Sequence, residues 1–374
     1  MFYGVFMYPT IVTMFYNINN SQRSTSTYIE NSKKFILTLP YPLVIYIDSN
    51  EKELFDILSD EREKNGLTHL TRIYKNDIRD TYFYKDLPRI EKLQSEFHIV
   101  NGHLEHETPI YVVLNNNKFC FMEKTIEANP FESSHFVWMD FGINHVAKNT
   151  EYIHTWIDKV PDKIKQLCIN PYIEPIKPKE YFERIYHNCA GGLFTGSKEN
   201  MLMYIALFKQ KTEQIYSEGW YQIDEAVMTL VHRENPHLFD FFYGDYEGII
   251  SNYLKPLHSW WLIRLNIDKC RNFDNTYYLY HILTYLDSYF MDECNQHSDD
   301  FYNYIINNII SNYYHNSKLL RGSVVALIQL KLNMKDHRMK NLVSYNENNL
   351  NFYQNKYLIK SNEFLNKIET NITA

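Results

Sequence analysis

The stretch FVWMDFGINH, residues 136–145, decides how this chain is expected to fold. Its first four residues are large and apolar, as in a strand that is buried on both faces of a parallel sheet. Asp140 ends the apolar run, and Gly142 follows two positions later. An acid at the carboxyl end of such a strand either caps a turn or faces a ligand, because ligands of parallel sheets bind at that edge. The stretch predicts a buried strand and leaves both roles open for Asp140.

Five further runs have the same character. They are short, bounded by turn residues and apolar on both faces. They are TIVTMFY (10–16), PLVIYID (42–48), THLTRIY (68–74), PIYVVL (109–114) and GGLFTG (191–196). Helical patterns alternate with them, at residues 118–128 with Asn117 as the N-cap and at residues 197–217 with Ser197 as the N-cap. This alternation predicts an α/β domain with a largely parallel sheet.

The pattern changes near residue 255. From residue 257 to residue 342 the apolar runs are helical, as in TYYLYHILTYLDSYF, and the last thirty residues are rich in Asn and Lys. We therefore predict an α/β domain over residues 1–255 and an all-α C-terminal lobe with a polar tail over residues 256–374.

Charge and composition limit the classes of protein. A net charge of −7 argues against a dedicated nucleic-acid binder, because such proteins need a basic face. The five cysteines form no CxxC pair, which favours a reducing, cytoplasmic location. The apolar start of the chain contains Pro9 and lacks a basic region, so we expect neither a signal peptide nor a transmembrane segment.

Small or acidic residues stand at the ends of four predicted strands. Asn17 follows the first strand, Asp48 follows the second, and the pair Gly191 and Gly192 opens the run at 191–196. Together with Asp140, they are expected to meet at one edge of the sheet. The adjacent glycines either let the backbone approach a ligand closely or form a tight entry into a strand.

Residues two apart on an extended chain face the same side, so acids at positions 140 and 142 could share a divalent cation. Gly142 offers only its backbone, and metal binding at Asp140 would need other oxygens. Asp224 and Glu225 stand at a predicted helix start in YQIDEAVMTLVH (221–232). They either stabilise the helix dipole, or one of them binds a sugar hydroxyl or removes its proton.

The segment FYGDYEGIISNYLKP, residues 242–256, contains Asp245 and precedes the change of composition. It either folds over a bound nucleotide or links the two domains through packed aromatic residues.

Six segments, in this order, resemble the HtrL/YibB-like family: TIVTMFYNI, LPYPLVIYID, PIYVVLNNNKFCFMEKTIEANPF, FVWMDFGINH, AGGLFTG and YQIDEAVMTLV. The resemblance covers about residues 10–255. The family is similar to nucleotide-sugar glycosyltransferases of the GT-A fold. The resemblance therefore implies a GT-A-like, Rossmann-like sheet that is mixed but mostly parallel and is flanked by helices.

The activity that this resemblance implies is transfer of a sugar from a UDP- or GDP-linked donor to a hydroxyl of a glycan or protein-linked glycan. Mn²⁺ or Mg²⁺ is the implied cation, with Asp140 at the metal and ribose. The other implied positions are Asn17 and Asp48 at the nucleoside, Lys118 at the start of a helix beside the diphosphate, Gly191 and Gly192 at the donor sugar, and Asp224 and Glu225 at the acceptor.

The sequence departs from the family pattern at Gly142, where many relatives carry a second Asp, and Asn144 or Asp245 would have to compensate. A different class therefore stays open: a non-catalytic sugar- or nucleotide-binding or protein-interaction module that keeps the fold. A nucleotidyltransferase is disfavoured, because the glycine-rich basic loop of such enzymes does not follow the first strand. The helical lobe is expected to recognise an acceptor, bind a partner or form a homo-oligomer.

Overall fold

The chain divides into two compact units, Met1–Pro256 and Leu257–Ala374. The computed structural model describes residues 8–18, 24–97, 99, 107–169, 178–185, 188–244, 246–254 and 263. The first unit is thus described in most of its length. The predicted helical lobe and its role in an oligomer lie outside the described residues.

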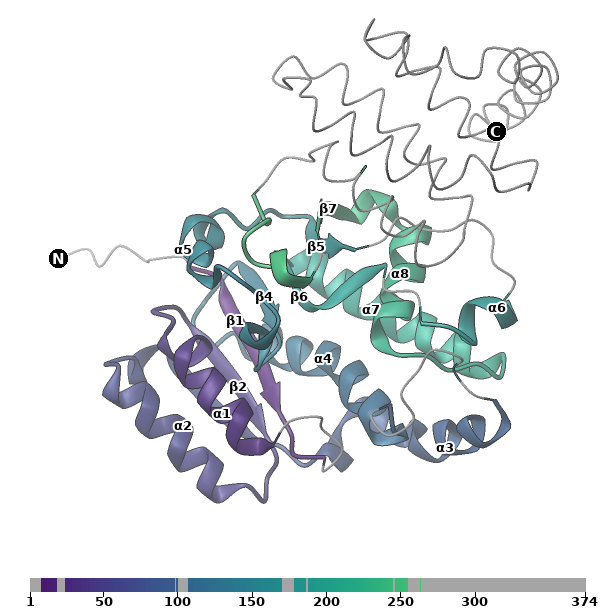
Figure 1. The fold of residues 1–374 in the computed structure, drawn as a ribbon, viewed down its shortest axis with the longest axis horizontal. Coiled ribbons are helices and arrows are strands. Elements are labelled where there is room, and N and C mark those ends of the chain that lie inside the picture. Colours follow the sequence, from purple (N-terminus) through teal and green to yellow (C-terminus); the bar gives the residue numbers. More distant parts are fainter. Residues whose placement is uncertain are drawn as a thin grey trace, which may run out of the picture. The chain divides into compact units, whose positions relative to one another are not determined.

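One mixed sheet forms the centre of the first unit. Its seven strands have the order β3-β2-β1-β4-β6-β5-β7. The strands are β1 (Thr10–Phe15), β2 (Leu43–Ile47), β3 (Thr71–Lys75), β4 (His135–Met139), β5 (Ile164–Cys168), β6 (Cys189–Ser197) and β7 (Phe239–Tyr243) (Figure 1). Neighbouring strands are parallel, except that β6 is antiparallel to both β4 and β5. The predicted α/β class with a mostly parallel sheet is confirmed.

The strand order reverses at β1. The chain proceeds from β1 outward to β2 and β3, and then returns to place β4 on the other side of β1. Ligands of such sheets bind beyond the carboxyl ends of the strands at this switch point. Because β6 is antiparallel, its first residues reach the same edge, where the Asp140 amide donates a hydrogen bond of 2.9 Å to the Gly192 carbonyl.

Helices cover both faces of the sheet. One core packs beneath α3 (Leu87–Glu96), α4 (Pro109–Ala128), α6 (Pro178–Phe182), α7 (Lys198–Ser217) and α8 (Asp224–Glu234). The other packs beneath α1 (Thr25–Lys34), α2 (Lys52–Lys64) and α5 (Ile153–Trp156). Successive residues of a strand point into the two different cores. Trp138 belongs to the core beneath α4, whereas Val137 belongs to the core on the opposite face. In Figure 1, α1 and α2 lie on the β1–β2 part of the sheet.

Most sequence-based elements are confirmed, with shifts of a few residues. The runs at 10–16, 42–48, 136–139 and 191–196 form β1, β2, β4 and β6, and the run at 68–74 forms a 3-10 turn followed by β3. The predicted helix at 197–217 is α7, and the side chain of Ser197 accepts a hydrogen bond from the Asn200 amide. Two strands, β5 and β7, are additional to those predicted.

The strand predicted at residues 109–114 is wrong, because this segment is the first part of α4. Thr108 is the N-cap, and Pro109 occupies the first helical position, where its missing amide hydrogen costs nothing. Asn117, the predicted cap, is buried in mid-helix, where its side chain donates to the Val113 carbonyl. The helix is buried around most of its circumference, and the short apolar run at its start has the composition of a strand.

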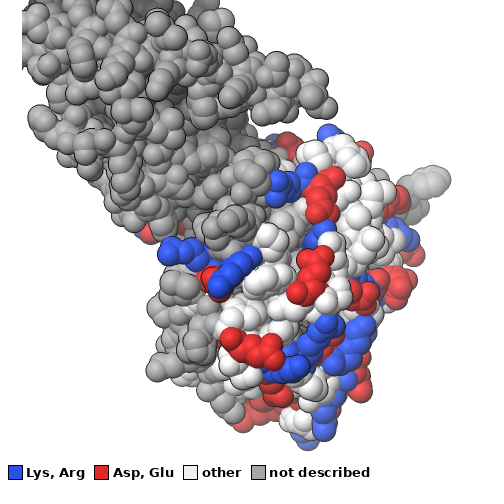
Figure 2. Space-filling view, turned by 90° about the vertical axis from the view of Figure 1, so that its right-hand side faces the viewer, with Lys and Arg blue, Asp and Glu red and all other residues white. Residues whose placement is uncertain are grey.

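The described residues contain no helix that combines the length and the apolar character needed to cross a membrane. On the face shown in Figure 2, basic and acidic side chains are interspersed over the described surface. Their mixture leaves no extended field of one sign on that face.

Candidate functional site

Lys118 of α4 is the centre of a buried charge cluster. Only 3% of the residue is exposed. Its Nζ lies 2.9 Å from Oδ2 of Asp224 and 3.4 Å from Oδ1 of Asp140, and it donates a hydrogen bond of 3.3 Å to the Gly191 carbonyl. The structure thus brings together four residues predicted for the site from α4, from the end of β4, from β6 and from α8.

The charge of Lys118 depends on these neighbours. Burial alone would lower the pKa of its ammonium, but the charges of Asp140 and Asp224 outweigh burial and raise the pKa above its ordinary value. A buried ammonium is tolerated only when it is paired in this way. Lys118 was expected to begin its helix, but it lies in the helix interior because α4 begins at Pro109.

Asp140 is the exposed member of the cluster. Its side chain is 42% exposed, whereas that of Asp224 is 5% exposed. The Trp138 indole donates a hydrogen bond of 2.8 Å to the same Oδ1 that faces Lys118. The backbone carbonyl of Asp140 accepts from the Ile143 amide and starts the turn after β4. The backbone therefore forms the turn, while the side chain belongs to the charge cluster.

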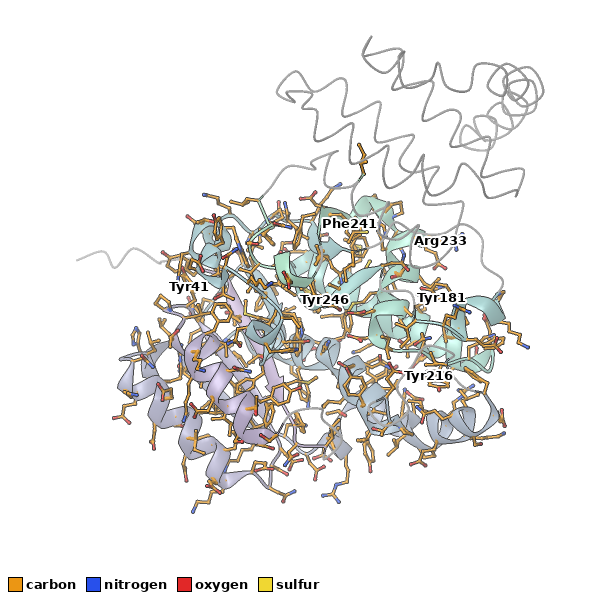
Figure 3. The ribbon with its side chains drawn as sticks, viewed as in Figure 1. Tyr41, Tyr181, Tyr216, Arg233, Phe241 and Tyr246 are labelled. Atoms are coloured by element: carbon orange, nitrogen blue, oxygen red, sulfur yellow. The ribbon has the colours of Figure 1, made fainter. Side chains whose placement is uncertain are left out.

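Asp224 and Glu225 begin α8, as predicted, and both are buried. Glu225 accepts a hydrogen bond of 2.9 Å from the Gly191 amide. The N-cap residue of α8 makes no side-chain hydrogen bond, so the two acids provide the negative charge that stabilises this helix end. Tyr181, labelled in Figure 3, donates a hydrogen bond of 2.8 Å to the Ala226 carbonyl and fixes the first turn of α8.

The two glycines of β6 have different surroundings. A Cβ atom at Gly191 would lie 2.7 Å from Oδ2 of Asp224 and 3.2 Å from Nζ of Lys118. A Cβ atom at Gly192 would lie 3.6 Å from Oδ2 of Asp140, which is an ordinary contact. Close backbone approach is thus required at Gly191, and the groups that approach there are the protein's own charged side chains.

The expectation that Gly142 shares a face with Asp140 does not hold. The strand ends at Met139, and Gly142 has a turned backbone with φ −104° and ψ 21°. A Cβ atom there would lie 2.7 Å from the Tyr28 ring, so position 142 faces α1. Asn144, in the same turn, donates its side-chain amide to the Asn31 carbonyl at 3.0 Å. Asp245, the other residue expected to compensate, lies outside the described residues.

A pocket of about 250 Å³ lies at the carboxyl ends of β1 and β2. Its lining comprises Tyr16, Asn17, Ile18, Asp48, Ile78 and Ile110. Asn17 and Asp48, which were predicted to lie together, therefore do so. Burial, and secondarily the charge of Asp48, raises the pKa of Tyr16, whose hydroxyl donates to the Asn76 carbonyl at 2.9 Å. The pocket combines apolar walls with a few polar groups, which is typical of small-molecule sites.

The first turn of α4 connects the pocket with the charge cluster. Ile110 lines the pocket, and Tyr111 lies seven residues before Lys118, on the same side of the helix. Burial raises the pKa of Tyr111 to about 12, with the charge of Lys118 opposing the shift and those of Asp224 and Asp140 adding to it. Tyr111 is thus a neutral hydroxyl near the cluster. The place of Tyr111 was not predictable from the sequence, because its seven-residue spacing from Lys118 is meaningful only in a helix.

A divalent cation at Asp140 would need further oxygen ligands from a bound molecule and from water. No group of three or more acids, histidines or cysteines within the described residues is arranged to hold a metal ion. Asp140 is one exposed carboxylate, whose Oδ1 contacts Trp138 and Lys118. One carboxylate suits Mg²⁺, which takes the rest of its ligands from phosphates and water. The residues therefore fit a cation that is held largely by a bound diphosphate.

These features define an α/β protein with a mixed sheet, in which a buried charge cluster and a pocket occupy the carboxyl edge at the switch point. Residues 8–253 match the HtrL_YibB family, which is described as bacterial protein of unknown function, and the chain belongs to this family. The match confirms the family resemblance seen in the six sequence segments. No curated protein matches the chain.

Proposed function

We propose that this chain is a glycosyltransferase that moves a sugar from a nucleotide-diphosphate sugar to an acceptor hydroxyl. The observation that carries the proposal is the position of Asp140. The exposed carboxylate stands at the switch point of the sheet, fixed from below by Lys118 and Trp138. The mixed, mostly parallel sheet with helices on both faces is the form that the GT-A resemblance implies, and it supports the proposal.

The pocket at β1 and β2 suits the nucleoside of such a donor. Isoleucine side chains provide apolar walls for a base, and Asn17 and Asp48 provide polar groups for a base edge or ribose hydroxyls. The donor would then extend past Tyr111 toward Asp140, with its sugar over the glycine pair of β6. UDP- and GDP-linked sugars are the donors that the resemblance favours.

Glycosyl transfer requires neutralisation of the leaving diphosphate and an oriented acceptor hydroxyl. Asp140 would hold Mn²⁺ or Mg²⁺ together with the diphosphate, and the cation would neutralise the charge that develops on the leaving group. A catalytic role was expected for Asp224 and Glu225, but their burial and their contacts with Lys118 and Gly191 favour a supporting role. We therefore assign the contact with ligand to Asp140.

The test is release of free nucleoside diphosphate across a panel of UDP- and GDP-linked sugars with Mn²⁺ or Mg²⁺. Wild-type protein should release nucleoside diphosphate from at least one donor. Asp140→Ala should lower this rate at least about 100-fold, because it removes the only strongly exposed carboxylate of the cluster. Asp56→Ala, an exposed site on α2, is the matched control and should keep the wild-type rate.

Full activity of Asp140→Ala would remove Asp140 from the mechanism. A wild-type protein that releases nothing from any donor would contradict the proposed activity.

One observation favours a second function, a non-catalytic sugar- or nucleotide-binding module. Two of the three acids around Lys118 and Gly191 are buried, so only Asp140 is well placed to act on a ligand. A binding module would gain thermal stability from nucleotide sugars without turning them over, because a ligand that binds only the native state stabilises it. Thermal unfolding with the same donor panel, measured beside the release assay, separates the two functions.

A further inference from the structure

Lys118 was expected beside the diphosphate, but its position in the structure indicates a different role. It is buried to 3% exposure in the interior of α4, so its ammonium lies beneath the surface on which a ligand would bind. Any effect on the reaction must pass through a neighbour. Among the acids that it contacts, Asp140 alone has a substantially exposed side chain.

The contacts of Asp140 are unequal at its two oxygens. Both donors, the Trp138 indole at 2.8 Å and the Lys118 ammonium at 3.4 Å, approach Oδ1. Oδ2 lies on the side of Gly192, 3.6 Å from the position that a Cβ atom there would occupy. Since Asp140 is the first residue after β4, these donors restrict a side chain that would otherwise be free to turn into solvent.

Lys118 is itself held at two further points. Asp224 lies 2.9 Å away on α8, and the Gly191 carbonyl on β6 accepts a hydrogen bond from its ammonium. A neutral side chain of the same length would leave Asp140 and Asp224 as neighbouring acids without their shared counter-charge, and acids in that situation repel each other.

We infer that Lys118 is a positioning residue, which holds Asp140 with Oδ1 turned inward and Oδ2 presented to the ligand. The inference rests on the proposed function only for the reaction that Asp140 serves. The orientation of Asp140 is a property of the protein without ligand and can be measured separately.

The experiment compares Lys118→Met, Lys118→Arg and wild-type full-length protein. The first readout is the indole N–H resonance of Trp138 in ¹⁵N-tryptophan-labelled protein. The chain has five Trp residues, so this resonance is assignable by a single Trp138→Phe variant. Loss of the ammonium should release Asp140, and the Trp138 indole N–H should move toward the position of a free indole and exchange faster with solvent.

The second readout is the split between kcat and KM for the best donor. Misplacing a reacting group by about 1 Å costs on the order of 100-fold in rate, so Lys118→Met should lower kcat about 100-fold. KM for the donor should stay within about threefold, because the nucleoside pocket is unchanged. Lys118→Arg, which restores the charge in a larger group, should recover about a tenth of the wild-type kcat.

Lys165→Met is the matched control. Lys165 is also a poorly exposed lysine paired with a carboxylate, that of Asp240 at 3.2 Å, but it lies on β5 outside the cluster. It should leave both the Trp138 resonance and kcat at their wild-type values. If Lys118→Met does not fold, Asp224→Asn replaces it, because it keeps Lys118 but weakens its anchor. We expect the same change of the resonance and a smaller, roughly tenfold loss of kcat.

An unchanged Trp138 resonance in Lys118→Met, or in Asp224→Asn where that variant is used, overturns the inference. So does a loss that falls on KM alone. If wild-type protein turns over no donor, the proposed function fails, and the resonance alone decides whether Lys118 orients Asp140. The two failures are therefore distinguishable.

Discussion

Two buried cations on opposite faces of the sheet differ in what surrounds them. Arg62 on α2 is 1% exposed and Lys118 on α4 is 3% exposed. Arg62 donates only to neutral oxygens: the carbonyls of Leu37, Leu39 and Tyr41, at 3.1, 2.7 and 3.2 Å, and the hydroxyl of Thr71 at 2.7 Å. Lys118 lies between two carboxylates and one carbonyl.

Burial acts to lower the pKa of both groups, but only Lys118 has charged partners that outweigh it. Burial lowers the pKa of the Arg62 guanidinium to about 10, whereas the neighbouring acids raise the pKa of Lys118 despite its burial. Arg62 joins the chain before β2 to the start of β3, and its partners within the described part of the chain are neutral, so we interpret it as structural. Lys118 contacts an acid that solvent can reach. A buried cation therefore indicates a functional site only when it contacts a group that a ligand can reach.

The largest expected effect is on stability, at Arg62. Arg62→Ala leaves three buried carbonyl oxygens without their donor, each at a cost of about 1–3 kcal/mol, so we expect a loss of about 4 kcal/mol in the free energy of unfolding. Chemical denaturation measures it, with the exposed Arg72→Ala as the control. Donor binding by the fraction that remains folded should be unaffected. A loss of less than about 1 kcal/mol in the free energy of unfolding would contradict the structural role of Arg62 and its contrast with Lys118.

A smaller effect is expected at the glycine pair. Gly191→Ala places a methyl group 2.7 Å from Oδ2 of Asp224 and 3.2 Å from Nζ of Lys118, so the cluster must shift, at a cost of about 1–3 kcal/mol. Gly192→Ala meets only ordinary contacts and should cost less than about 1 kcal/mol. Unfolding curves and donor turnover of the two variants, measured side by side, would show whether the cluster tolerates displacement. Equal behaviour would contradict the asymmetry described for these residues.

A further effect extends the comparison to a base whose pKa is shifted by burial alone. His232 of α8 packs against the rings of Phe239 and Phe241, the latter labelled in Figure 3, and burial lowers its pKa from 6.5 to about 4. The folded state therefore binds fewer protons than the unfolded state between these values. Its contribution to stability is complete above pH 6.5 and is lost as the pH falls toward 4.

Allowing for partial exposure of the ring, this loss is on the order of 2 kcal/mol. Unfolding of wild type and of His232→Leu at pH 8 and at pH 4.5 isolates it from the carboxylates that titrate in the same range. Identical pH dependence in both proteins would show that His232 carries no such penalty.

The sheet was predictable because its central strands are buried on both faces and therefore consist of continuous apolar runs. The strand β5 was not, since its sequence IKQLC contains Lys165 and the buried Gln166, whose amide donates to the Ala190 carbonyl. Only the completed fold supplies that partner. The site residues followed from a rule about strand ends, which correctly places Asn17, Asp48 and Asp140 at one edge.

The rule failed where the chain bends or reverses. Gly142 was paired with Asp140 on the premise of an extended chain, whereas the backbone turns after Met139. The glycine pair reaches the edge because β6 is antiparallel, which the sequence does not reveal. The role of Lys118 depends on α4 starting at Pro109, and an apolar run of six residues could not distinguish that helix from a strand.

The continuity of α4 has a mechanical consequence. Ile110 borders the pocket at β1 and β2, and Lys118 lies beneath the exposed acid. The two residues are eight positions apart on one unbroken helix and so about 12 Å apart along its axis. A continuous helix resists axial compression, so a displacement of its first turn would be passed on to the ammonium two turns away.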